Sequence, residues 1–191
     1  MNITCKCHTF FCALLFLGQS CQLNAQEVSN EFFPGLTKDV YTDWLAGVSY
    51  NKSIFIESPY DATTGAAVHW NIVDDMIYLG VAVTQATGWA AFGLAESGSM
   101  RGADIVMYTA ETDTLTDTYV LDELVQPFLD TCQSWTLINS VVDDGFIIFE
   151  AKRLLNTSDT QDRIIIDDSQ YIIPVTRVIA AWGNDTTPSY H

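Results

Sequence analysis

A methionine and a histidine form the pair of side chains in this 191-residue sequence that could hold a redox cofactor. Met100 lies in a stretch of small and polar residues, Ala95–Gly102, and His191 is the final residue. A thioether with an imidazole is one of the axial ligand pairs that hold haem iron, and it favours electron transfer because it leaves no open coordination position. The alternative is that Met100 fills a gap in the hydrophobic core, since methionine adapts to irregular spaces.

Two carboxylates form a second candidate site. Asp104 opens an otherwise apolar segment, and a buried carboxylate must be neutral, hydrogen-bonded or bound to a cation. Hydrogen bonding to the neighbouring loop is the simpler interpretation, and a hard-metal site with a second oxygen from Asp130 is the other. Three further carboxylate pairs lie at expected turns, where they end strands and stay solvated. They are Asp74-Asp75, Asp143-Asp144 and Asp167-Asp168.

Catalytic motifs are missing from the sequence. It contains no G-x-S-x-G, no H-E-x-x-H and no glycine loop that could cradle a phosphate. Beyond the first 25 residues the histidines are His69 and His191, and no convincing Ser/His/Asp arrangement can be built from them. His69 lies beside Asn71 on the polar side of its expected strand, which favours a structural histidine over a ligand. We therefore expect a protein that is not an enzyme by itself.

Residues 1–25 predict a secretory signal peptide. Lys6 supplies a positive charge, Phe10–Leu17 forms a short apolar core, and Ala25 is a small residue suited to cleavage. The apolar part is too short to span a bilayer, so we expect a secreted protein with no transmembrane segment in its mature chain. Four of the five cysteines leave with this peptide, and Cys132 remains.

Charge and candidate glycosylation sites describe the expected surface. The formal net charge of −16 argues against nucleic acid and against anionic membranes as partners. Such acidity is common in secreted proteins, and it also suits weak cation binding or a positively charged partner. Three Asn-x-Ser/Thr sequences are candidate glycan acceptors, at Asn51, Asn156 and Asn184.

Alternating and apolar runs predict strands from Tyr41 onward. Ala67–Val73 alternates and Met76–Thr84 is apolar on both faces, so the turn between them predicts a hairpin. Trp89–Leu94 and Ala103–Tyr108 are expected to pair, with the thioether of Met100 directed into the interior. Further strands are expected over Thr118–Leu121, Trp135–Val142, Gly145–Arg153 and Pro174–Trp182. Ala110–Asp117 is expected as a polar connection, and Asp122–Cys132 as a helical or irregular excursion.

The number and spacing of these runs define the fold class. Roughly eight to ten short strands with little helix are typical of an all-β sandwich. After the signal peptide of residues 1–25, we expect a polar lead-in over residues 26–40 and one domain over residues 41–191.

The motif in the middle of the chain resembles the DOMON domain. It reads Gly88-Trp89-x-x-Phe92-Gly93, followed by Gly98-Ser99-Met100-x-Gly102-Ala103-Asp104-Ile105-Val106. Asp144-Gly145-Phe146, the run Lys152–Asp159, and Val178–Gly183 leading to Tyr190-His191 extend the resemblance over residues 41–191. It implies an extracytoplasmic immunoglobulin-like antiparallel β-sandwich.

One branch of that family consists of haem-binding cytochrome domains. In them a methionine and a histidine hold haem b, and Met100 and His191 match those ligand positions. This similarity implies an electron-transfer module that binds haem or another small ligand, or meets a protein redox partner.

A second branch precedes the catalytic domains of copper type II, ascorbate-dependent monooxygenases of the dopamine β-hydroxylase type. Lys152–Asp159 and Tyr190-His191 are most similar to this branch, in which the domain is a cofactor-free accessory module. The sequence has none of the histidine-rich copper motifs of the catalytic domains. Ser158 stands where this branch often has a cysteine that ties the module to its catalytic partner. A cation site near the aspartate that matches Asp104 has been proposed in this branch.

Overall fold

The computed structural model describes residues 36, 38–58, 64–95, 98–121, 126–166 and 177–186. The expected signal peptide, most of the lead-in, Asp167-Asp168 and His191 lie outside the described residues. The elements in chain order are α1 (Asp39–Gly47), β1 (Lys52–Glu57), β2 (Gly65–Val73), β3 (Met76–Thr84), β4 (Trp89–Ala95), β5 (Asp104–Thr109), β6 (Thr114–Tyr119), β7 (Phe128–Leu129), β8 (Thr136–Asp143), β9 (Phe146–Leu154) and β10 (Arg177–Gly183).

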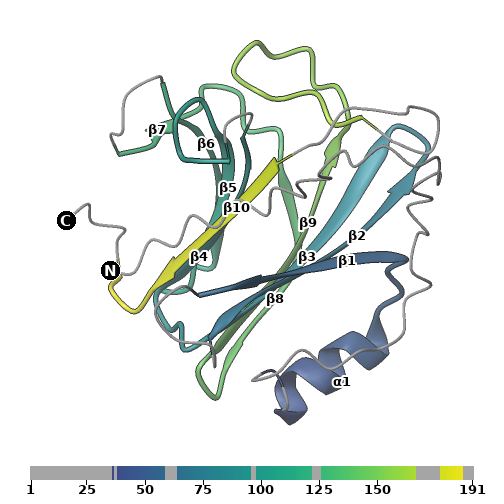
Figure 1. The fold of residues 1–191 in the computed structure, drawn as a ribbon, viewed down its shortest axis with the longest axis vertical. Helices are drawn as coiled ribbons and strands as arrows, with labels where there is room; N and C mark the ends of the chain where they lie inside the picture. Colours follow the sequence, from purple (N-terminus) through teal and green to yellow (C-terminus); the bar gives the residue numbers. More distant parts are fainter. Residues whose placement is uncertain are drawn as a thin grey trace, which may run out of the picture.

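Two antiparallel sheets face each other and confirm the expected all-β sandwich (Figure 1). The first sheet has the order β1-β2-β3-β9-β8, and the second has the order β10-β4-β5-β6-β7. Trp89–Leu94 and Ala103–Tyr108 are neighbours as expected, because β4 pairs with β5 in the second sheet. The described part contains ten strands, within the expected range.

Both expected hairpins of the first sheet are present. Val73 pairs with Met76 across the turn at Asp74, and Asp143 pairs with Phe146 across the turn at Asp144-Gly145. Asp144 and Gly145 both have positive φ, 47° and 79°, as a two-residue turn between right-twisted strands requires. The carboxylate pairs at these two turns are therefore turn-forming, as the sequence predicts.

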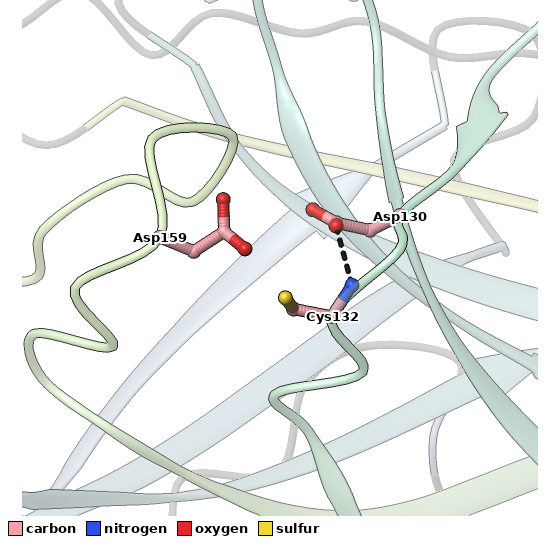
Figure 2. A group of neighbouring side chains, drawn as sticks. All are labelled: Asp130, Cys132 and Asp159. Atoms are coloured by element: carbon pink, nitrogen blue, oxygen red, sulfur yellow. Dashed lines mark hydrogen bonds between the residues drawn. The ribbon is translucent and has the colours of Figure 1, made fainter.

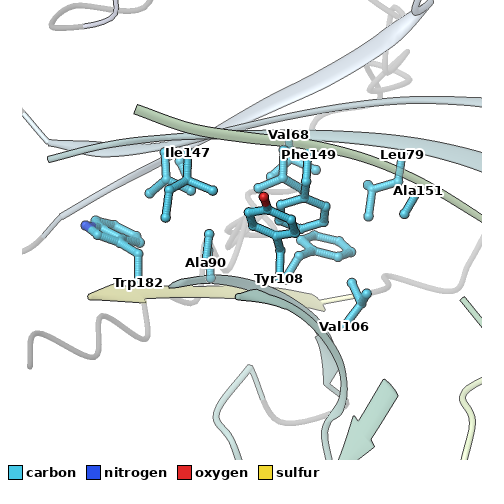
Figure 3. Close-up of a cluster of buried hydrophobic side chains, with 14 of the residues drawn as sticks. Val68, Leu79, Ala90, Val106, Tyr108, Ile147, Phe149, Ala151 and Trp182 are labelled. Atoms are coloured by element: carbon cyan, nitrogen blue, oxygen red, sulfur yellow. The ribbon is translucent and has the colours of Figure 1, made fainter. Parts of the chain in front are cut away.

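Apolar side chains from both sheets fill the space between them (Figure 3). Val68, Leu79 and Phe149 of the first sheet meet Val106 and Tyr108 of the second. The rings of Tyr108 and Phe149 stack with centroids 5.8 Å apart. This core fixes the two sheets relative to one another and so positions the loops at their ends.

The helix α1 corrects the expectation of continuous strands from Tyr41. Tyr41 and Trp44 lie three residues apart, so a helix places both on one face, against the outer side of the first sheet (Figure 1). Gly80 of β3 lies beneath the indole, where an added Cβ would be 2.7 Å from Trp44 Cζ2. Trp44 Nε1 donates to Glu150 Oε1 at 3.0 Å. These tertiary contacts outweigh the weak helix propensity of the segment.

The connection after β5 also differs from the expectation. Thr114–Asp117 belongs to strand β6 and pairs with β5. The β-branched threonines at alternate positions favour a strand. Within Asp122–Cys132, the described residues 126–132 contain the short strand β7 and no helix.

Candidate functional site

Met100 is buried on the outer face of the second sheet and not between the two sheets. Its side chain is 9% exposed and belongs to an apolar cluster separate from the inter-sheet core. In β4, Phe92 and Leu94 face the first sheet, whereas Trp89 and Ala91 belong to the Met100 cluster. The members of this cluster are Trp89, Ala91, Ala95, Met100, Ala103, Ile105, Val120 and Ile179. The expectation that the Met100 thioether points into the sandwich interior is therefore wrong, because the side chain packs against the outer face of the second sheet.

The backbone around Met100 is fixed by a tight turn. Ala103 N donates to Met100 O at 3.0 Å, and Gly102 adopts a φ of 63° that L-residues with a Cβ rarely adopt. Two backbone hydrogen bonds then join this turn to the segment after β6: Gly102 N donates to Leu121 O, and Val120 N donates to Ala103 O. The structure thus presents one ligand of the predicted haem pair, and His191 lies outside the described residues.

A group of three buried carboxylates lies at one end of the inter-sheet space. Asp104 begins β5, Asp117 lies on β6, and Asp162 comes from the loop that follows β9. One oxygen of each lies within 4.8 Å of the others. We refer to these three residues as the three-aspartate group.

Arg153 of β9 is the cation that reaches this group from the first sheet. Its Nη1 lies 2.8 Å from Asp104 Oδ2 and 3.6 Å from Asp162 Oδ1, and its side chain is fully buried. Its guanidinium lies over the Trp135 ring, with Cζ 4.8 Å from the centroid. Asp104 Oδ2 also accepts the backbone N–H of Arg163 at 2.7 Å. Asp104 is therefore both ion-paired and hydrogen-bonded, as the simpler sequence interpretation requires.

The other two carboxylates are not satisfied in the same way. Asp117 Oδ2 accepts the N–H of Ser134 at 3.0 Å, but Asp117 Oδ1 and both oxygens of Asp162 are buried without a hydrogen bond from any described residue. Burial, followed by the neighbouring charge of Asp162, raises the pKa of Asp117 to about 7. Burial also raises the pKa of Asp104, although the Arg153 guanidinium acts in the opposite direction. When all three carboxylates are ionised, their negative charge exceeds the single positive charge of the Arg153 guanidinium.

The donor set of this group fits a hard divalent cation. Carboxylate oxygens are the ligands of Ca²⁺ and Mg²⁺, and none of the three residues offers nitrogen or sulfur. The orphaned oxygens of Asp117 and Asp162 are the atoms that such an ion would take.

Asp104 and Asp130, predicted together as metal ligands, lie in two different groups. Asp130 lies with Cys132 and Asp159, whereas Asp104 lies with Asp117 and Asp162. A backbone hydrogen bond of 2.9 Å from Asp130 N to Asp117 O joins the two neighbourhoods.

Sequence reasoning missed Arg153 as a site residue although a signal was present. Ile147, Phe149 and Ala151 alternate along β9 toward the core, and Arg153 is the next residue in that row. An arginine at a core-facing position must meet buried carboxylates or backbone oxygens. Asp117 was missed because its segment was interpreted as a connection, and Asp162 because loop carboxylates are usually solvated.

His69 is buried beneath α1, as expected for a structural histidine. Its Nε2 lies 2.8 Å from the hydroxyl oxygen of Tyr41, and its ring packs among Tyr41, Trp44 and Tyr50. Burial lowers its pKa from 6.5 to about 4, so the imidazole is neutral at physiological pH.

The three candidate glycan acceptors, Asn51, Asn156 and Asn184, are all exposed. The helix in the described part of the chain is too short and too polar to cross a membrane.

A comparison with family models identifies the domain. The model described as DOMON domain matches residues 63–176, which is more than half of the chain. The match includes β2 to β9 and therefore both Met100 and the three-aspartate group. The chain belongs to the DOMON domain family, a family of ligand-binding and redox-type modules.

Proposed function

We propose that this chain is a secreted accessory module of a monooxygenase-like protein, and that it holds one Ca²⁺ ion in the three-aspartate group. The observation that carries the proposal is the excess of buried carboxylate. Among the residues that the structure describes, three carboxylates face the Arg153 guanidinium, and three of their oxygens have no hydrogen bond. In this proposal the module binds the ion and has an accessory role, and other domains carry out catalysis.

Charge balance supports a divalent ion. Three ionised carboxylates and Arg153 sum to −2, from −3 and +1, and a divalent cation brings the sum to zero. Unpaired buried charge is costly, so either protons or a cation must compensate it. Asp117, with its pKa raised to about 7, is the residue that takes a proton when no cation is bound.

The position of the ion gives it a structural role. Asp104 and Asp117 belong to the second sheet, whereas Asp162 lies in the loop after β9 of the first. An ion shared by all three would fasten that loop across the end of the sandwich. The run Lys152–Asp159, the stretch most similar to the accessory modules of the copper monooxygenases, covers the end of β9 and the first part of the same loop.

Thermal unfolding with Ca²⁺ or with a chelator tests this proposal. At a Ca²⁺ concentration about 100 times the dissociation constant, binding adds about 2.7 kcal/mol. For a protein of this size that raises the melting temperature by roughly 5–10 °C. We expect the shift in the wild-type chain and in Asp143→Asn, which removes an exposed turn carboxylate, but not in Asp162→Asn. No Ca²⁺-dependent shift in the wild type, or an equal shift in all three, contradicts the proposal.

Haem b held by Met100 and His191 is the second candidate. The observation in its favour is the buried apolar cluster around Met100, which contains three small residues, Ala91, Ala95 and Ala103. At Gly93 of the same face an added Cβ would lie 2.9 Å from the side chains of Ile105 and Ile179. Ile105 and Ile179 therefore pack over this glycine, and the thioether lies in the kind of apolar surroundings that cofactor sites have. When bound, haem would supply one-electron redox chemistry.

An absorption spectrum after addition of haem tests this second candidate. A low-spin haem band in the wild type that is lost in Met100→Leu supports ligation by the thioether, because leucine keeps the volume and removes the sulfur. Absence of the band in the wild type contradicts it, and so does its persistence in Met100→Leu.

A further inference from the structure

A second group of possible metal ligands lies beside β7 and includes the cysteine at position 132. Asp130 follows β7 directly, Cys132 comes two residues later, and Asp159 lies in the loop after β9. One ligand atom of each lies within 4.8 Å of the others. Figure 2 shows the sulfur and the two carboxylates directed toward a common space.

Each carboxylate of this group is oriented by a backbone amide. Cys132 N donates to Asp130 Oδ1 at 2.9 Å, and Gln161 N donates to Asp159 Oδ1 at 2.8 Å. Asp159 also accepts hydrogen bonds from the Cys132 thiol and from the Thr160 backbone, so the protein fixes the orientation of both carboxylates. Fixed orientation of this kind is what neighbouring hydrogen bonds give to metal-binding side chains.

A buried oxygen of Asp130 is an independent indication that this group binds a cation. The residue is 3% exposed, and its Oδ2 is buried with no hydrogen bond from the part of the chain that the structure describes. Figure 2 shows this oxygen on the side of the carboxylate that faces Asp159. Buried carboxylate oxygens normally have partners, so an oxygen without one next to a thiol and a second carboxylate indicates a cation.

The thiol of Cys132 is exposed and takes part in the same group. Its hydrogen bond to the Asp159 carboxylate raises the pKa of the thiol, and the charges of Asp159 and Asp130 act in the same direction. The hydrogen bonds from Gln161 and Cys132 lower the pKa of Asp159, which is therefore ionised. A metal ion bound to Cys132 Sγ would take the position that the thiol proton now has, between the sulfur and the Asp159 carboxylate.

We propose that Asp130, Cys132 and Asp159 bind a Zn²⁺ ion, with water from the exposed side as the fourth ligand. Zinc accepts a thiolate together with carboxylate oxygens in a tetrahedral arrangement, and three protein ligands plus water are a common set. A thiolate selects zinc over calcium or magnesium, which distinguishes this site from the three-aspartate group. The ion replaces the proton on Cys132 Sγ, and its two positive charges offset two of the three ligand charges.

The site would join two segments that are distant in sequence. Asp130 and Cys132 follow β7 at the end of the second sheet, and Asp159 lies in the loop after β9 of the first sheet. The Thr131 hydroxyl already donates to Gln161 Oε1 across this gap at 3.4 Å. A bound zinc would therefore fix the same loop that the three-aspartate group holds from the inside.

Cobalt replaces zinc as a spectroscopic probe in the test. The full chain is kept reduced with a phosphine, treated with a chelator and titrated with Co²⁺. We expect a near-ultraviolet sulfur-to-cobalt charge-transfer band that saturates at one ion per chain and disappears when Zn²⁺ is added. The apparent affinity should rise about tenfold per pH unit below the thiol pKa, because one proton leaves for each ion bound.

Matched variants identify the ligands. Cys132→Ser should abolish the band, which also excludes the other four cysteines of the chain as its source. Asp159→Asn should weaken Co²⁺ binding at least tenfold, whereas Asp162→Asn in the three-aspartate group should leave it unchanged. Circular dichroism confirms that each variant folds, and an exposed Cys132→Ser change leaves the core intact. The proposal is overturned by no band in the wild type, by a band that survives in Cys132→Ser, or by equal losses in Asp159→Asn and Asp162→Asn.

Discussion

Arg153 Nη1 and Asp104 Oδ2 lie 2.8 Å apart and join the two sheets of the sandwich through a fully buried ion pair. Arg153 comes from β9 of the first sheet and Asp104 from β5 of the second. The pair holds the three-aspartate group together, because Arg153 also lies 3.6 Å from Asp162 Oδ1 and donates from Nη2 to Arg163 O at 2.6 Å. The candidate cation site is thus built around a contact between the sheets.

Removal of the guanidinium should strongly destabilise the fold. Arg153→Met removes the buried charge that pairs with Asp104 and Asp162, and breaking a buried pair costs about 3–5 kcal/mol. The matched control is Lys38→Met, whose ion pair with Asp144 has side chains 48% and 61% exposed, so its loss should cost less than about 1 kcal/mol. Urea unfolding measures both in the presence of chelator. Similar costs for the two variants would show that Arg153 does not neutralise the group.

Asp117 should make the stability of the cation-free protein fall as the pH rises. Its folded pKa of about 7 lies above the ordinary carboxyl value of 3.8, so between these values the folded state holds a proton that the unfolded state has lost. The stabilisation that this proton gives to the folded state is fully present below pH 3.8 and is lost as the pH rises through 7. The loss in the free energy of unfolding is about 4 kcal/mol at most.

The Asp117→Asn variant isolates this dependence. Asparagine can still accept the Ser134 N–H but carries no charge. With chelator present, we expect its advantage over the wild type to grow between about pH 5 and about pH 8. Saturating Ca²⁺ should remove that advantage, since the ion balances the wild-type charge. A constant difference across this pH range would show that the Asp117 pKa is not raised.

His69 should contribute a pH dependence of the opposite sign. Its folded pKa of about 4 lies below the ordinary 6.5, so the unfolded state takes up a proton first as the pH falls. Stability is therefore intact above about pH 6.5 and falls toward pH 4, by about 3 kcal/mol. Nuclear magnetic resonance titration of the imidazole measures the folded pKa directly. A midpoint near 6.5 would contradict the burial of a neutral ring beneath α1.

Met100 should contribute to stability whether or not a cofactor binds. Met100→Ala removes a buried side chain from the apolar cluster and should cost about 2–5 kcal/mol, whereas Met100→Leu should cost less than about 1.5 kcal/mol. Thermal unfolding of both variants without haem measures this. If Met100→Ala leaves the melting temperature unchanged, packing of the Met100 side chain does not stabilise the cluster.

The sheet pairings could be predicted because local patterns specify them. The alternation of Ala67–Val73 and the turn at Asp144-Gly145 each fix a hairpin, whichever tertiary partners follow. Helix α1 could not be predicted in this way, because its stabilising contacts are distant in sequence. Trp44 packs on Gly80 and donates to Glu150, and the Tyr41 hydroxyl bonds to His69. The helical conformation of this segment therefore depends on tertiary packing and not on helix propensity.

The site was only partly predictable for a similar reason. Asp104 is conspicuous in an apolar segment, so its burial could be inferred from the sequence alone. Its partners Arg153 and Asp162 lie 49 and 58 residues further along the chain, and only the closing of the two sheets brings them to it. Asp130 is close to Asp117 in space, but its side chain turns toward Cys132 and Asp159.

Terbium luminescence tests the central claim, a cation in the three-aspartate group, most directly. Tb³⁺ occupies calcium sites of oxygen ligands, and its emission is sensitised by a nearby indole such as Trp135, whose ring lies against Arg153. We predict tryptophan-sensitised emission that saturates at one ion per chain, that Ca²⁺ displaces, and that is lost in Asp162→Asn but retained in Asp159→Asn. No sensitised emission from the wild type, or equal emission from Asp162→Asn, would contradict the account.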